Sequence, residues 1–120
     1  MQESVIYIAS DHAGCVLKGF VRAHLVPNGH NLIDLGADGD VSVDYPDFGV
    51  KLAMALRDDA QAFGIAVCGS GIGISIAVNR FSWIRAALVN SPEAAGLSRQ
   101  HNDANVLALG ERMIAPDLAI

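Results

Sequence analysis

The chain has little of what marks secreted, membrane or nucleic-acid-binding proteins. Of its 120 residues 2 are cysteine, 6% are aromatic and 18% are charged, with 13 acidic against 8 basic residues. A net charge of −5 argues against sequence-independent binding to nucleic acid or to an anionic membrane, because both kinds of binding need a basic surface. No apolar run approaches the roughly 20 residues of a membrane helix, and the N-terminus does not resemble a signal peptide. We therefore expect no nucleic-acid partner, no membrane partner and a reduced, cytoplasmic protein.

The chain is rich in small and branched aliphatic residues. Hydrophobic residues make up 52% of it, a composition that suits buried parallel strands and the helices that cover them. Short apolar runs predict strands, and segments of helical period between them predict helices. The expected strands are 5–9, 31–35, 64–68, 84–89 and 105–109; the expected helices are 14–26, 46–60, 74–80 and 91–100, with a loop over 36–44. This alternation predicts one α/β domain over 1–120, a three-layer α/β/α sandwich around a five-stranded parallel sheet, Rossmann-like, with ligands at the carboxyl ends of the strands.

A first polar cluster follows the first expected strand. Asp11 and His12 place a hydrogen-bond acceptor and a titratable group at the edge of the sheet where ligands bind. A helix N-cap is the simpler interpretation of Asp11 alone. The role of His12 stays open on this evidence.

A glycine-rich turn, Cys-Gly-Ser-Gly-Ile-Gly at 68–73, follows the third expected strand. Its N–H groups, at the start of a helix, can hold a phosphate or an oxyanion. Ile74 stands where a dinucleotide fingerprint needs glycine, and no Lys-Ser/Thr pair makes a P-loop. The positive end of the helix favours the thiolate form of Cys68, a base or nucleophile. The alternatives are a plain strand–turn–helix corner and a cysteine that acts as a small buried hydrophobe.

Two further clusters flank the last expected strand. His101 and Asn102 end the fourth helix, before that strand, so they belong to the opposite edge of the sheet unless they serve a partner subunit. Helix capping and a turn explain them equally well. Arg112 follows the strand and can reach an anion, or it is simply solvated. No Cys-x-x-Cys or His-x-x-x-His spacing is present, so we expect no metal site.

Together these motifs resemble the ribose-5-phosphate isomerase B family, which includes galactose-6-phosphate and allose-6-phosphate isomerases. The resemblance runs along nearly the whole chain, through SDHAG at 10–14, LK at 17–18, DYPDF at 44–48, CGSGIGISIAVN at 68–79, IRAAL at 84–88 and RQHNDANVLALGER at 99–112. It implies an aldose–ketose isomerase that needs no cofactor and converts ribose 5-phosphate to ribulose 5-phosphate through an enediolate. The alternatives are another sugar phosphate (allose 6-phosphate, galactose 6-phosphate or a tetrose phosphate) and a non-catalytic sugar-phosphate-binding protein. A flavodoxin-like regulatory domain is disfavoured, because the acidic cluster and strand-end lysine of a phospho-acceptor are missing.

The resemblance also implies roles for single residues. Cys68 would be the base that moves a proton between C1 and C2, Ser70 would assist proton movement at the oxygens, and His101 would open the sugar ring. Relatives that use a glutamate as base carry it at the position of Ile74, so this chain resembles the cysteine branch. The residues expected to bind substrate are Asp11 and Asn102 for the sugar, His12 and Arg112 for the phosphate, Tyr45 at the wall of the site, and Gly69, Gly71, Ile72 and Gly73 for the enediolate.

Two expectations concern what lies beyond one chain. The family forms homodimers, or dimers of dimers, with sites at the subunit interface, which would explain where His101 lies. Relatives continue past the equivalent of Ile120 into a helix with phosphate-binding basic residues, so we expect this domain to lack the family's C-terminal helix.

Overall fold

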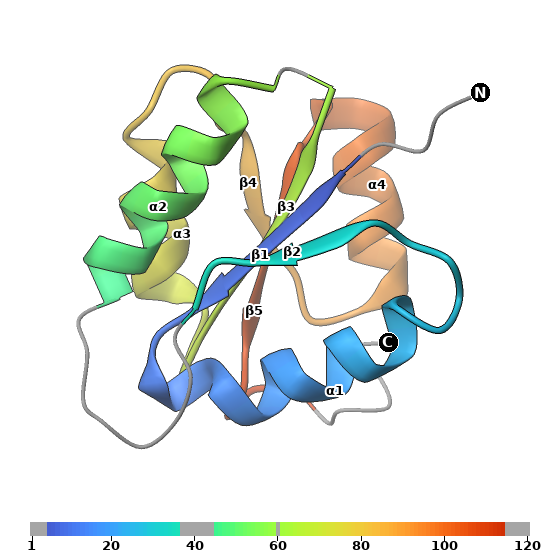
Figure 1. The fold of residues 1–120 in the computed structure, drawn as a ribbon. Helices are drawn as coiled ribbons and strands as arrows, with labels where there is room; N and C mark the ends of the chain where they lie inside the picture. The colour runs from blue at the N-terminus through green and yellow to red at the C-terminus, as the bar shows by residue number, and fades with distance from the viewer. Residues whose placement is uncertain (1–4, 37–44, 60, 115–120) are drawn as a thin grey trace.

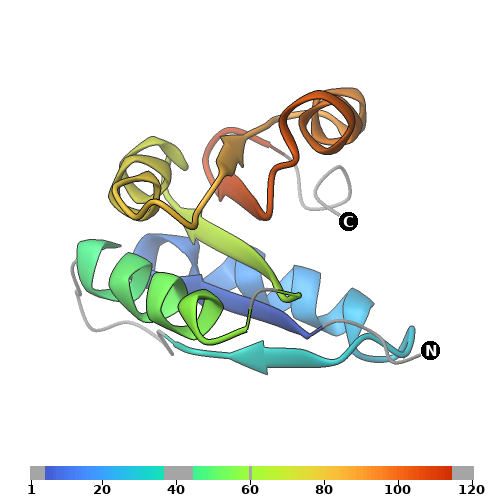
Figure 2. The same cartoon turned by 90° about the horizontal axis from the view of Figure 1, so that it is seen from above.

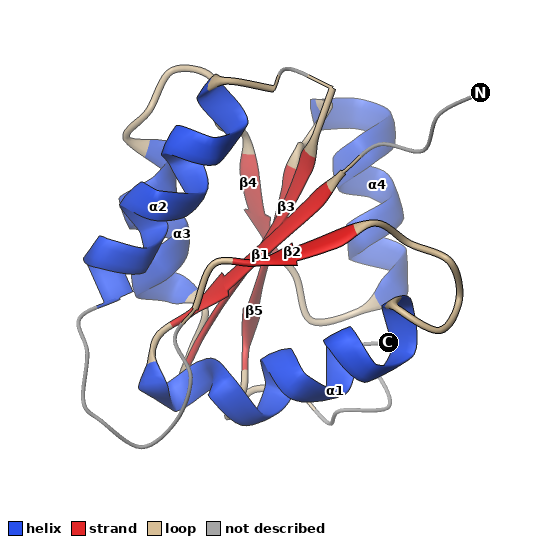
Figure 3. Cartoon of the chain, in the orientation of Figure 1, coloured by secondary structure: helices blue, strands red, loops and turns tan. Residues whose placement is uncertain are grey.

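The computed structural model describes residues 5–36, 45–59 and 61–114. Strands and helices alternate along the chain (Figure 3). The strands are β1 (Ile6–Ser10), β2 (Leu32–Asp34), β3 (Phe63–Cys68), β4 (Ala86–Leu88) and β5 (Val106–Gly110). The helices are α1 (Cys15–Leu25), preceded by a 3-10 turn (His12–Gly14), α2 (Tyr45–Arg57), α3 (Ile72–Asn79) and α4 (Pro92–Asn102).

The strands form one parallel sheet in the order β2-β1-β3-β5-β4 (Figure 1). Helices α2 and α3 cover one face of it, and α1 and α4 cover the other (Figure 2). The predicted three-layer α/β/α architecture with a five-stranded parallel sheet is therefore confirmed. The position of β5 between β3 and β4 follows from the tertiary structure alone.

The core is divided by the sheet into two clusters, because neighbouring residues of a strand point to opposite faces. On the α2–α3 side Ala66 and Cys68 of β3 pack with a cluster that includes Leu52, Leu56, Ile74 and Val78. On the α1–α4 side Ile65 and Val67 pack with a cluster that includes Ile8, Leu17, Val21 and Leu109. Burial on both faces is why the strands read as continuous apolar runs.

The expected elements are all present, and their ends differ for local reasons. The strand expected over 84–89 shortens to Ala86–Leu88, because side-chain amides bind the main chain beside it. Asn79 contacts both the N–H and the carbonyl of Ala86, at 2.8 and 3.0 Å, and Asn105 accepts from Arg85 N–H at 2.7 Å. The expected loop over 36–44 lies outside the described residues except for Gly36. Residues 115–120, which bear on the expected lack of the family's C-terminal helix, lie outside them as well.

Candidate active site

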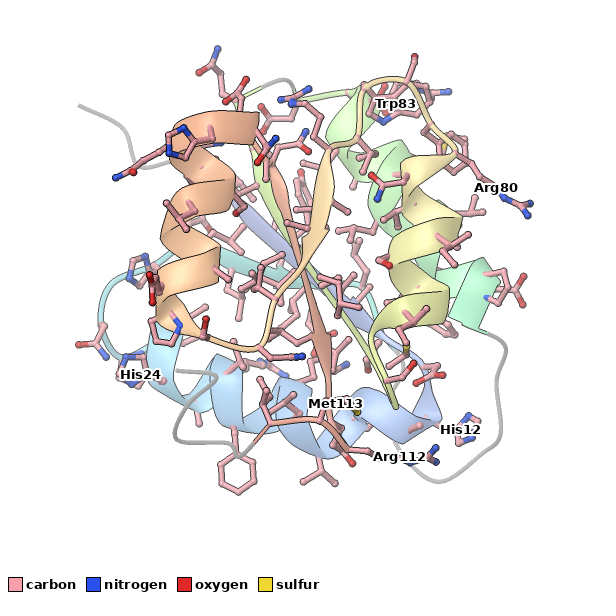
Figure 4. The ribbon with its side chains drawn as sticks, turned by 180° about the vertical axis from the view of Figure 1, so that it is seen from behind. His12, His24, Arg80, Trp83, Arg112 and Met113 are labelled. Atoms are coloured by element: carbon pink, nitrogen blue, oxygen red, sulfur yellow. The ribbon has the colours of Figure 1, made fainter. Side chains whose placement is uncertain are left out.

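The sheet has a switch point between β1 and β3. Helix α1 leaves β1 on one face and α3 leaves β3 on the other (Figure 2), and sheets of this kind bind ligands beyond the carboxyl ends of the strands at such a point. An open cleft of about 290 Å³ lies there, lined by Asp11, His12, Ala13, Cys68, Gly69, Ser70, Gly73 and Arg112. The three clusters that follow β1, β3 and β5 in the sequence therefore meet in one place. Figure 4 shows His12 and Arg112 at this same end of the sheet.

The glycine-rich turn holds the Cys68 thiol against the start of α3. The N–H of Gly71 donates to Cys68 Sγ at 3.1 Å, and the sulfur sits at the edge of the cleft with its residue only 5% exposed. The sulfur therefore accepts a hydrogen bond from the main chain beside the start of α3. Gly71 has a φ of +80°, in the left-handed region that favours glycine. Cys68 is also buried in the α2–α3 cluster, as expected of a cysteine that acts as a small buried hydrophobe, and its role as a base stays a prediction.

The other side chain of the turn is tied to its own backbone. Ser70 Oγ accepts from the N–H of Ile72 at 3.1 Å, while its residue remains partly exposed to the cleft. The N–H groups of Gly71 and Ile72 are thus engaged with Cys68 and Ser70. Gly69 and Gly73, two of the residues expected to bind the enediolate, line the cleft. Ile74, the position of the glutamate in other relatives, is completely buried in the core.

Asp11 caps the turn after β1 and lines the cleft. It is 7% exposed and lines the cleft, and its Oδ1 accepts from Gly14 N–H at 3.1 Å, so the capping interpretation is confirmed. A Cβ at Gly14 would come within 2.7 Å of the Val67 carbonyl oxygen. This close approach presses the first turn after β1 onto β3 and brings Asp11 beside Cys68. His12, the next residue, is exposed at the cleft.

Arg112 forms the third wall of the cleft. Its N–H donates to the Gly69 carbonyl at 2.9 Å, and its guanidinium lies over Gly69, whose added Cβ would be 3.1 Å from Nη1. The guanidinium is exposed beside His12, so Arg112 gives this wall a positive charge.

His101 and Asn102 lie at the other end of the sheet. They end α4, and Asn105, three residues after Asn102, accepts from Gly64 N–H at 2.9 Å at the start of β3. Both are exposed, and within one chain they do not reach the cleft. The expectation that they occupy the opposite edge is confirmed. Tyr45 begins α2, and its side chain lies outside the described residues.

Sequence reasoning missed one residue that lines the cleft and one contact next to it. Ala13 lines it and carries no chemical signal. Glu111 Oε1 accepts from Leu17 N–H at 2.7 Å, which ties the turn after β5 to α1 across 94 positions. No local pattern pairs residues so far apart, so only the folded chain shows this contact.

A second hollow, of about 240 Å³, lies at the amino ends of the strands between α4 and the sheet. Its lining is mainly apolar, and the Arg99 guanidinium there stacks on Phe63 and pairs with Asp103 at 3.2 Å. That arginine is already engaged, so the hollow offers less to an anion than the cleft does. Within 5–36, 45–59 and 61–114 no group of three or more His, Cys, Asp or Glu side chains could hold a metal ion. In the same ranges no helix has the length and apolar character needed to cross a membrane.

Comparisons with known proteins agree with this geometry. A family model described as Ribose/Galactose Isomerase matches residues 6–120. Ribose-5-phosphate isomerase B of Escherichia coli is 45% identical over 114 residues, 95% of this chain and 76% of that protein.

Solved structures are similar over the same extent. A ribose-5-phosphate isomerase B of Clostridium thermocellum matches with a TM-score of 0.93 and 50% identity, covering 96% of this chain and 78% of that one. A ribose-5-phosphate isomerase B of Mycoplasma genitalium, with bound ribulose-5-phosphate, matches with a TM-score of 0.94 and 38% identity, covering 100% of this chain and 80% of that one. Since the family model covers nearly the whole chain and the relatives align along most of their length, the chain belongs to the ribose/galactose isomerase family.

Proposed function

We propose that this protein, an isomerase by its family, interconverts ribose 5-phosphate and ribulose 5-phosphate through an enediolate, with Cys68 as the base. The observation that carries the proposal is the 3.1 Å contact from Gly71 N–H to Cys68 Sγ within the cleft. It supports a thiolate next to N–H groups that can stabilise an oxyanion. The relative with bound ribulose-5-phosphate supports the choice of substrate.

The proposed reaction moves two protons. The Cys68 thiolate takes the proton from C2 of the open-chain aldose, and the electron pair of that bond forms the C1–C2 double bond while O1 becomes the oxyanion. N–H groups of Gly69 and Gly73 stabilise that charge. The Ser70 hydroxyl relays the proton of O2 to O1, and the Cys68 thiol returns its proton to C1. The products are a ketose and the regenerated thiolate, so atoms and charge balance.

The remaining residues of the cleft would hold the substrate. Arg112, which carries the positive charge of its wall, and His12 beside it are proposed to bind the phosphate by hydrogen bonds. Asp11, whose Oδ1 caps the turn, would accept a hydrogen bond from a sugar hydroxyl. Tyr45 is proposed to line the site near the start of α2.

A homodimer would complete this site. His101, proposed to open the sugar ring, and Asn102, proposed to bind the sugar, lie exposed at the edge of the sheet away from the cleft. A second copy of the chain can supply both, so the working enzyme is proposed to be a homodimer or a dimer of dimers. The buried free thiol of Cys68 supports a reducing, cytoplasmic setting.

Steady-state turnover tests the proposal. Ribose 5-phosphate, allose 6-phosphate and galactose 6-phosphate are offered to wild type, Cys68→Ala and, as the matched control, Cys15→Ala. General-base catalysis contributes about 10²–10⁴-fold, so Cys68→Ala should lose at least about 100-fold in kcat with ribose 5-phosphate. Cys15→Ala should keep most of the wild-type rate, because its thiol points to the Asp11 carbonyl, at 3.3 Å, within the helix start.

Two results would contradict the proposal. Full activity of Cys68→Ala would mean that the base is another group. Clear calorimetric binding with no turnover of any of the three sugars would instead show a sugar-phosphate-binding protein. A higher kcat/KM with a hexose phosphate would correct the substrate and leave the chemistry in place.

A further inference from the structure

Glu111 supplies a cap for α1 from the far end of the chain. Leu17 is the third residue of α1, and its N–H is one of the donors that a helix start leaves without an intrahelical partner. The N-cap residue Gly14 offers no side-chain acceptor. Glu111 Oε1 takes that role at 2.7 Å, and its negative charge is favourable at the positive end of the helix.

The main chain around Glu111 is bound to the glycine-rich turn. Glu111 N–H donates to the Cys68 carbonyl at 2.9 Å, and the next N–H, of Arg112, donates to the Gly69 carbonyl at 2.9 Å. One residue therefore joins the three walls of the cleft. Its side chain holds the start of α1, its backbone holds the turn that carries Cys68, and it directly precedes Arg112.

We propose that Glu111 is a positioning residue for the phosphate end of the cleft. Its carboxylate holds α1 at a set distance from the turn after β5, which keeps His12 and Arg112 on the two sides of one anion position. The same carboxylate occupies the positive end of α1, so the phosphate is directed to His12 and Arg112, and the start of α3 stays available for the enediolate. The part of this inference that concerns substrate rests on the proposed function.

The test compares Glu111→Ala, Glu111→Gln and a control at the opposite end of α1. In Asn28→Ala an exposed side chain loses its hydrogen bond to the His24 carbonyl, 2.6 Å long, so the same helix loses a cap remote from the cleft. Four quantities are measured: the melting temperature, hydrogen exchange of the Leu17 amide, kcat and KM for ribose 5-phosphate, and the Kd for inorganic phosphate.

Glu111→Ala should speed exchange of the Leu17 amide and raise KM and the phosphate Kd by about tenfold, the effect of about 1.4 kcal/mol. Its kcat should stay within about threefold of wild type, because Cys68 and Ser70 keep their own hydrogen bonds within the turn. Glu111→Gln retains an oxygen acceptor and should recover most of the affinity. Asn28→Ala should leave KM and the phosphate Kd unchanged, even if its melting temperature falls as much as that of Glu111→Ala.

Separate results overturn the inference and the proposed function. Faster exchange at Leu17 with an unchanged phosphate Kd in Glu111→Ala would show a helix cap alone and overturn the positioning role. Loss of phosphate affinity in Glu111→Gln with the Leu17 amide still protected from exchange would overturn it as well. In that case α1 would still be held in place, so the loss would have another cause. Absence of turnover in wild type would overturn the proposed function, while the phosphate Kd of the three variants would still decide the role of Glu111.

Discussion

Replacing Gly71 with alanine perturbs the turn that holds Cys68 in two separable ways. The first is backbone strain, because a φ of +80° is left-handed. The second is steric overlap, because an added Cβ would lie 2.5 Å from Leu88 Cδ1, 2.9 Å from the Leu109 carbonyl carbon and 3.0 Å from Gly110 N. Gly29, with a φ of +88° and nothing within 4 Å of its added Cβ, carries the strain without the overlap. The pair Gly71→Ala and Gly29→Ala therefore isolates the cost of the close approach.

The structure allows both costs to be worked out. An L-residue in the left-handed region loses about 1–2 kcal/mol, and alanine recovers about 0.4–1 kcal/mol by restricting the unfolded chain. Gly29→Ala should therefore lower the free energy of unfolding by about 1 kcal/mol. At Gly71 the Leu88 side chain can rotate away, but the β5 backbone is paired with β3 and must shift, which adds about 1–3 kcal/mol. Gly71→Ala should lose about 2–4 kcal/mol in all, a large share of a typical 5–15 kcal/mol.

Urea unfolding followed by circular dichroism measures these values. Gly19→Ala serves as the opposite control, because Gly19 lies within α1 with nothing within 4 Å of its Cβ and should gain up to about 1 kcal/mol. Equal losses for Gly71→Ala and Gly29→Ala would refute the reasoning, since they would mean that the turn does not press on β5. A loss at Gly71 should also lower turnover, because the N–H that contacts Cys68 Sγ belongs to the same residue.

Two further predictions concern charged side chains. Lys18→Met should lower the free energy of unfolding by about 2 kcal/mol, because the largely buried Asp34 carboxylate loses its 2.8 Å partner and keeps the exposed Arg22 at 3.3 Å and the Gly36 N–H at 2.9 Å. Urea unfolding of that variant and of Lys18→Met/Asp34→Leu checks this: the double variant should recover most of the loss, and a loss near zero in the single variant would mean that Arg22 alone compensates the Asp34 charge. Arg112→Ala should raise KM for ribose 5-phosphate by about 10–100-fold, the worth of about 1.5–3 kcal/mol for hydrogen bonds to a charged group. Steady-state kinetics measures this, and an unchanged KM would place the phosphate elsewhere.

Much of the site could be predicted because it is local to single strand ends. In a parallel sheet the carboxyl ends of the strands share one edge, so Asp11, Cys68 and Arg112, each just after a strand, were expected to meet. The cleft joins them. His101 was expected at the other edge by the same rule, and it ends α4 there. Roles that depend on substrate or on a second chain, such as ring opening by His101, remain predictions.

The sequence by itself determined the order and type of the elements. Apolar periodicity and the turn residues act over a few positions, so strands such as β3 and β5 and the helix start at Ser91, which accepts from Ala94 N–H at 3.1 Å, could be recognised locally. Only the tertiary structure decided which strands are neighbours and which distant groups pair. The β5 strand between β3 and β4, the Lys18–Asp34 pair and the Glu111–Leu17 bond are of this kind. They arise because covering both faces of the sheet and satisfying buried polar groups are properties of the whole folded chain.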